Sequence, residues 1–136
     1  MKSREVDWPM VRTRAAMFPE EAFDFVRDGL KHTVTMLHGR PPAAAVQARP
    51  VGATPARRHV SGQQLCSGLK DLAVVRYGLL APTVLKKWGI ARTDDFGTIV
   101  YAMIDRQELK TSDGDSIEDF RAVYDFDEVF GALTLA

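Results

Sequence analysis

The spacing of apolar residues along the chain predicts several amphipathic helices. Between Pro19 and Gly39, large apolar residues recur every three or four positions, which is the period of a helical face that is turned toward a core. These residues are Phe23, Val26, Leu30, Val34 and Leu37. Pro19 suits the first turn of a helix and Gly39 suits its end, so the pattern predicts a helix over residues 19–38.

A second helix is predicted to begin after Ser61. Ser61 and Gln64 have the spacing of a capping box, in which each side chain accepts a hydrogen bond from the backbone N–H of the other residue. The residues that follow keep the helical period, and Gly78 marks the end of the helix. One predicted face of this helix consists of Leu65, Leu69, Leu72 and Arg76, with Cys66 and Ala73 beside it.

Two more helices are predicted farther along the chain. Pro82 begins a short one, in which Leu85 and Trp88 are expected to face the core. Thr93 is expected to cap the next one, because threonine is a favoured N-cap residue and two aspartates follow it in the first turn. The apolar face of this fourth helix consists of Phe96, Ile99, Val100, Met103 and Ile104.

The helical period is lost after Leu109. Asp113 and Gly114 are typical of a two-residue hairpin turn, because both tolerate a positive φ angle, so residues 109–120 are predicted to form a small β-hairpin. Three helices followed by a hairpin is the element order of a winged-helix module. The predicted fold is therefore mainly α, with a winged-helix-like core and residues 19–38 as an extra N-terminal helix.

The composition changes along the chain in a way that predicts one domain with irregular segments. Residues 1–17 are expected to be an N-terminal arm, and residues 18–136 a single helical domain. Within that domain, residues 39–57 hold four prolines among small residues, which predicts a loop that no regular helix can cross. Residues 113–130 form an acidic segment that also contains several aromatic residues.

Bulk composition narrows the function classes. With 136 residues, of which 46% are hydrophobic and 26% charged, the chain fits one globular domain. Residues 1–60 carry ten lysines or arginines against six acidic residues, and residues 61–136 carry eight against twelve. This balance excludes a uniformly basic nucleic-acid binder but not a local basic surface. Cys66 is the single cysteine, and no apolar run has the length of a signal peptide or a membrane span, so we predict a cytoplasmic protein.

Three segments of the chain resemble a known group of proteins. They are RHVSGQQL at residues 58–65, WGIARTDDFGTIV at 88–100 and YDFDEVF at 124–130. On these segments the chain resembles the small conserved hypothetical proteins restricted to planctomycetes and verrucomicrobia, and the resemblance extends over residues 19–38 and 58–130. It implies a bacterial lineage and a compartment but no reaction, because that group has no assigned activity.

The chain departs from this group at two places. The Pro/Ala-rich segment between residues 39 and 57 is longer than the resemblance leads us to expect. Gln107 and Glu108 also stand where a glycine is expected near the end of the fourth helix. The second departure weakens the expectation of a tight turn into the predicted hairpin.

No set of residues predicts catalysis or a cofactor. Cys66 lies in an apolar helical stretch, where a free cysteine is typically a small buried hydrophobe, and no spacing forces His59 toward it. Asp113, Asp115 and nearby acids cluster, but Glu118 stands where a calcium loop that begins at Asp113 needs a glycine. The sequence therefore predicts no catalytic residue, no metal site and no cofactor, and it does not favour an enzyme.

The leading hypothesis is a non-catalytic protein-interaction module, and the alternative is winged-helix-type nucleic-acid binding through a basic face. Asp94, Asp95 and Asp105 on the predicted fourth helix would repel phosphate, so a base-reading role for that helix is disfavoured. The acidic and aromatic residues from Tyr124 to Glu128 either pack on the domain or meet a basic partner. The candidate interaction surface consists of Arg57, Arg58, Lys86, Lys87, Arg92, Tyr124, Asp125, Phe126 and Asp127.

Overall fold

The computed structural model describes residues 6–39, 60–111 and 114–134, and every regular element within these residues is helical. The α-helices are α1 (Trp8–Ala15), α2 (Glu20–His38), α4 (Gly62–Tyr77), α5 (Ala81–Lys87), α6 (Thr93–Asp105) and α7 (Phe126–Thr134). Two 3-10 helices are η3 (Gly78–Leu80) and η4 (Ile117–Phe120). The predicted mainly α fold is confirmed. Except for Gly39, the predicted loop at residues 39–57 lies outside the described residues.

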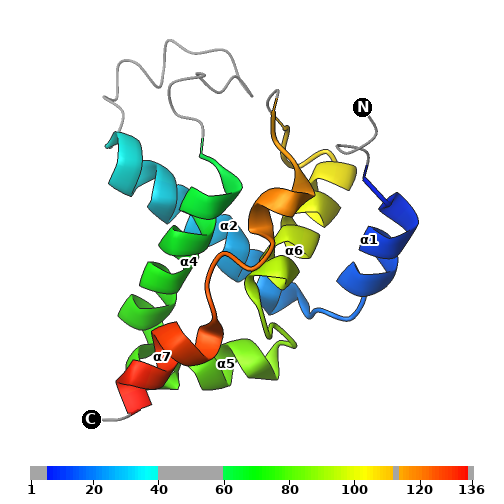
Figure 1. Ribbon diagram of the computed structural model, residues 1–136. Coiled ribbons are helices and arrows are strands. Elements are labelled where there is room, and N and C mark those ends of the chain that lie inside the picture. Colours follow the sequence, from blue (N-terminus) through cyan, green and yellow to red (C-terminus); the bar gives the residue numbers. More distant parts are fainter. Residues whose placement is uncertain (1–5, 40–59, 112–113, 135–136) are drawn as a thin grey trace.

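The helices pack around one core (Figure 1). α2 lies at the back of the molecule, with α4 and α6 in front of it, and α5 lies across the lower ends of α4 and α6. α1 packs on the outer side of α6, and the segment from η4 to α7 crosses the front of the molecule over α4 and α6. Among the described residues, no helix is long and apolar enough to cross a bilayer.

The segment that was predicted as an N-terminal arm contains α1. The carboxylate of Asp7 accepts a hydrogen bond from the backbone N–H of Met10 at 3.1 Å, which caps the helix. Val11 is fully buried against the domain. The guanidinium of Arg12 donates to both carboxylate oxygens of Asp105 in α6, at 2.9 and 2.8 Å. α1 is therefore attached to the domain by one apolar contact surface and one bidentate ion pair.

α4 begins as predicted, whereas α6 does not. The Ser61 backbone N–H donates to Gln64 Oε1 at 2.9 Å, and the Gln64 N–H donates to Ser61 Oγ at 3.1 Å, so the capping box is confirmed. In α6 the N-cap residue is Arg92. The predicted cap, Thr93, lies in the first turn, and its side chain is fully buried. Thr93 faces inward because its hydroxyl forms hydrogen bonds with the backbone of Phe120 and Val123.

The buried face of α2 differs from the predicted stripe in its C-terminal half. Phe23 and Val26 are buried as expected, but Leu37 is 44% exposed. Gly29 and Thr33 are buried instead, because they face α4. A Cβ atom on Gly29 would overlap the side chain of Leu69, and one on Gly68 would overlap that of Thr33. Each helix thus has a glycine at the point of closest approach, Gly29 in α2 and Gly68 in α4. The predicted stripe of α2 consists of large apolar residues, so it does not include this contact.

The predicted β-hairpin is not found. Within the described part of residues 109–120 there is no strand, and Asp113 lies outside the described residues. A turn of 3-10 helix, η4, forms there instead. Ser116 Oγ accepts a hydrogen bond from the Glu118 N–H, and the Asp119 carboxylate accepts one from the Ser116 N–H, both at 3.1 Å. This reciprocal capping stabilises a helical turn rather than a strand.

Candidate interaction surface

Thr93 fastens the C-terminal segment to the start of α6. Its Oγ1 donates to the Phe120 carbonyl oxygen at 2.7 Å and accepts from the Val123 N–H at 3.0 Å. Both bonds are shielded from water because the threonine is fully buried, which strengthens them. The carboxylate of Asp94 accepts a third hydrogen bond, from the Ala122 N–H at 3.1 Å. These bonds fix the backbone of residues 120–123 against α6.

Two aromatic residues continue this attachment. The Tyr124 hydroxyl donates to the Cys66 carbonyl oxygen in α4 at 2.7 Å, and burial raises the pKa of Tyr124 above its ordinary value. The ring of Phe126 lies 5.9 Å, centroid to centroid, from the rings of both Tyr124 and Phe96. Phe130, one turn later, is buried. The acidic and aromatic segment therefore packs on its own domain.

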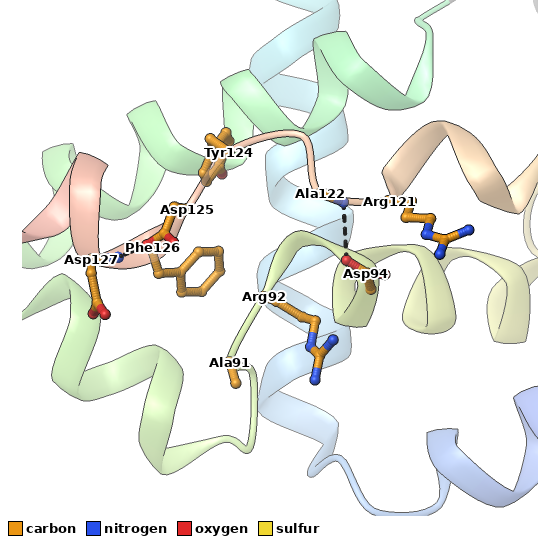
Figure 2. Close-up of a pocket in the computed structure, with 9 residues that line it drawn as sticks. All are labelled: Ala91, Arg92, Asp94, Arg121, Ala122, Tyr124, Asp125, Phe126 and Asp127. Atoms are coloured by element: carbon orange, nitrogen blue, oxygen red, sulfur yellow. Dashed lines mark hydrogen bonds between the residues drawn. The ribbon is translucent and has the colours of Figure 1, made fainter.

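An open hollow of about 490 Å³ lies where this segment meets the start of α6 (Figure 2). Its walls come from the residues before α6, from the chain between η4 and α7, and from the first turn of α7. It is lined by Ala91, Arg92, Asp94, Arg121, Ala122, Tyr124, Asp125, Phe126 and Asp127. We call this feature the α6–α7 hollow. Five of its nine lining residues belong to the surface predicted from the sequence, although Arg92 is far from the other four in the chain.

The charges around the α6–α7 hollow are separated in space. Figure 2 shows Arg92 and Arg121 on one side, with the carboxylate of Asp94 between them, Asp125 and Asp127 on the other side, and the ring of Phe126 in the middle. Within the part of the chain that the structure describes, Arg92, Asp125 and Asp127 form no ion pair. Arg121 has one exposed ion pair, within its own turn, at 3.3 Å. No pair of opposite charges closes across the hollow, so these groups face solvent.

The remaining residues of the predicted surface do not join the hollow. Lys86 and Lys87 are exposed at the C-terminal end of α5 and do not line it. Arg57 and Arg58 lie outside the described residues. The structure thus brings together the acidic and aromatic residues of the prediction with one arginine, and it leaves the two lysines on a separate part of the surface.

An exposed apolar strip, which was not predicted from the sequence, comes shortly before Lys86 and Lys87 in the chain. Val75, Leu79 and Leu80, at the end of α4 and in η3, are between 60% and 70% exposed. Val84, one helical turn after Leu80, is half-buried. We call Val75, Leu79, Leu80 and Val84 the α4–α5 strip. A signal was available, because the strip includes a pair of leucines in the short junction between two predicted helices, where neither helix buries them.

Cys66 has the surroundings of a structural residue. Its side chain is fully buried, and this burial raises the pKa of its thiol to about 12, with the charge of Asp94 adding to the shift. The thiolate needed for nucleophilic attack is therefore strongly disfavoured at neutral pH. Among the described residues, no three histidine, cysteine or acidic side chains lie close enough together to hold a metal ion.

Comparison of the chain with protein-family models, with curated proteins and with solved structures finds no match. The similarity to the planctomycete and verrucomicrobial proteins stays a prediction, and so does the cytoplasmic location. Function must therefore be inferred from the surface of the molecule itself.

Proposed function

We propose that this chain is a non-catalytic protein-interaction module that binds its partner through the α4–α5 strip. The observation that carries the proposal is the joint exposure of Val75, Leu79 and Leu80, three large apolar side chains that are each at least 60% exposed. Contiguous apolar side chains left in water are typical of surfaces that another protein covers. Their burial contributes favourable free energy at about 25 cal/mol for each Å² of apolar surface removed from water.

The chemistry of the strip indicates what the partner presents. Leu80 and Val84 are one helical turn apart at the start of α5, whereas Val75 lies on the other side of Gly78, whose φ angle of +53° ends α4. The apolar face of a second helix can cover a short strip of this kind. Lys86 and Lys87 follow directly on α5, and Lys87 continues the line from Leu80 and Val84. The partner is therefore an amphipathic helix whose apolar face covers the strip and whose acidic residues face the two lysines.

The chain itself contains a helix of this kind on the adjacent surface. α7 packs against η3 and α5, with Phe130 buried and with Asp127 and Glu128 exposed. An acidic amphipathic helix is thus compatible with this end of the molecule. The proposed partner helix would lie beside α7 and extend the same packed layer.

Nucleic-acid binding through a basic face was the alternative from the sequence. α6, the base-reading helix of a winged-helix arrangement, contains no lysine or arginine between Thr93 and Asp105 and carries three aspartates. Those carboxylates oppose the approach of phosphate. The winged-helix arrangement of α4, α5 and α6 itself stays a prediction. No feature of the described residues favours binding of nucleic acid over binding of protein. Nucleic-acid binding is therefore treated as one possible outcome of the pull-down experiment below.

The test is a quantitative pull-down of the tagged full-length chain from its native cells, with and without nuclease, followed by mass spectrometry. We expect one stoichiometric protein that survives nuclease and whose recovery falls at least tenfold with Leu79→Ser combined with Leu80→Ser. Lys86→Glu combined with Lys87→Glu should weaken recovery and reverse its dependence on salt, because the acidic residues of the partner would then face like charges.

The matched control is Met17→Ser, since Met17 is 80% exposed but lies at the end of α1, away from the strip. Its recovery of the partner should equal that of the unchanged chain. Equal recovery by the strip variant and the control would contradict the proposal. So would recovery of nucleic acid together with loss of the protein partners after nuclease treatment, and that result would favour the alternative.

A further inference from the structure

We propose that the α6–α7 hollow is a separate binding site for a bipolar ligand, one that carries a carboxylate at one end and an ammonium or guanidinium group at the other. Such a ligand comes either from a small zwitterionic molecule or from a peptide segment that has an acidic and a basic side chain. The two sources share the chemistry that the hollow recognises. The site does not involve the α4–α5 strip and does not depend on the proposed partner.

The placement of the charges selects a bipolar ligand over a simple ion. Three carboxylates and two guanidinium groups line the hollow: Asp125 and Asp127 form one side, and Arg92 and Arg121 form the other, which also holds the Asp94 carboxylate bound to the Ala122 N–H. An inorganic anion would therefore enter a site with excess negative charge, and a simple cation would meet two arginines. A ligand with both charges, by contrast, can direct its carboxylate to the arginine side and its cation to the acidic side, as these sides are arranged in Figure 2.

One charged group on each side of the hollow has no ion-pair partner. Arg92 and Asp127 form no ion pair among the described residues, so a ligand need not break one to reach them. Asp125 uses Oδ1 to accept from the backbone N–H groups of Asp127 at 2.7 Å and Glu128 at 3.3 Å. This cap fixes the orientation of the Asp125 carboxylate at the start of α7.

The backbone on the arginine side is held in place before any ligand arrives. One carboxylate oxygen of Asp95 accepts from the backbone N–H groups of Ala91 at 2.8 Å and Arg92 at 3.2 Å. Asp94 holds Ala122, which has a φ angle of +48°, a conformation that a residue other than glycine rarely adopts without support. A fixed backbone reduces the conformational entropy that binding must remove, so it raises affinity.

The hollow also has an apolar part and an adequate size. The ring of Phe126 is half-buried and lies between the two charged sides in Figure 2, where it can contact the middle of a ligand. The hollow has a volume of about 490 Å³ and is open to solvent, so a ligand in it is only partly enclosed. A short peptide segment or a small metabolite can lie along it with its charged ends at the opposite sides.

The test is an NMR titration of the isotope-labelled full-length protein with end-blocked tripeptides. The probe is Lys-Leu-Glu with acetylated and amidated ends, and the comparison peptides replace its Lys or its Glu by Gln. We expect amide shifts at Ala122, Asp127 and Glu128 with the bipolar peptide, and at least tenfold weaker binding of both single-charge peptides. Free lysine, free glutamate and inorganic phosphate complete the set. Binding of a free amino acid at the same amides would identify a small molecule as the source.

Two variants make the test specific. Arg92→Gln and Asp127→Asn each remove the charge that has no ion-pair partner on its side of the hollow, and each should weaken binding of the bipolar peptide at least tenfold. Arg14→Gln and Glu21→Gln remove one charge of each sign outside the hollow and should change nothing. Leu79→Ser should also leave the titration unchanged, which separates this site from the α4–α5 strip. Absence of shifts with every probe, equal binding of the Gln-containing peptides, or preferential binding of phosphate would overturn the proposal.

Discussion

Substitution of Gly68 by alanine tests the close contact between α2 and α4. An alanine normally stabilises the interior of a helix by about 0.8–1.0 kcal/mol relative to glycine. At Gly68, however, the new Cβ would lie 2.8 Å from Thr33 Cβ and 3.1 Å from Thr33 Cγ2, and it would overlap Thr33 Oγ1. Real Cβ atoms do not tolerate such distances, so either the threonine must rotate or the helices must move apart.

Both ways of relieving the overlap cost stability. Thr33 Oγ1 donates to the Gly29 carbonyl oxygen at 2.7 Å, and rotation of this buried side chain would lose that bond, at about 0.5–1.5 kcal/mol. Separation of packed helices by one added methyl group typically costs about 1–3 kcal/mol. These costs exceed the gain in helix propensity, so we expect Gly68→Ala to destabilise the protein by about 1–3 kcal/mol. For a domain of this size that lowers Tm by roughly 4–12 °C.

The assay is urea and thermal unfolding followed by circular dichroism. Ser67→Ala, at the exposed neighbouring position of the same helix, serves as the control and should be neutral or slightly stabilising. Thr33→Ala removes Oγ1 and Cγ2, so the double variant should lose at least about 1 kcal/mol less than the sum of the single variants. If Gly68→Ala raised stability as much as glycine-to-alanine changes do at exposed helical sites, the α2–α4 contact described above would be wrong.

Three further predictions concern single residues. Gln107 follows α6 with a φ angle of +68°, a conformation that suits glycine, so Gln107→Gly should stabilise the protein by about 0.5–1 kcal/mol in urea unfolding. A loss of stability would argue against this turn. Thr93→Val removes two buried hydrogen bonds at nearly constant volume and should destabilise by about 2–4 kcal/mol, measured in the same way; a loss below about 1 kcal/mol would refute its fastening role. Because burial raises the pKa of Cys66 from 9.0 to about 12, the unfolded chain releases this proton first, so stability should fall as the pH rises from about 9 to about 12. Unfolding free energies measured across that window should fall less steeply for Cys66→Ala, and an equal slope would contradict the burial of the thiol.

Residues close together in the sequence determined most of what was predicted correctly. The start of α4 follows from Ser61 and Gln64, which are three positions apart and satisfy each other's backbone groups without help from the rest of the fold. The end of α2 follows from Gly39, whose φ angle of +75° few other residues adopt. The family resemblance led us to expect a glycine near Gln107, and Gln107 has a positive φ angle, the conformation that glycine adopts most easily.

Several local signals were present and were outweighed by contacts with distant residues. Thr93 has the side chain of an N-cap, but it bonds to Phe120 and Val123, about 30 positions later in the chain, so Arg92 takes the cap position. Asp113 and Gly114 suit a hairpin turn, yet the capping interactions of Ser116 favour η4 nearby. In both cases the segment from η4 to Val123 and the start of α6 hold each other in place, through the bonds of Thr93 and the packing of η4 on α6.

The candidate surfaces needed the tertiary structure for a different reason. Arg92 and Asp127 are 35 positions apart, and only the attachment of residues 120–126 to α4 and α6 brings them to one hollow. The exposure of Leu79 and Leu80 had one signal in the sequence, their place between two predicted helices, but only the fold shows that no other element covers most of their surface. Sequence alone determined where α4 begins and where α2 ends, because capping and backbone preference act over about four residues. Which faces are buried was decided by the fold, because burial depends on every other element that packs nearby.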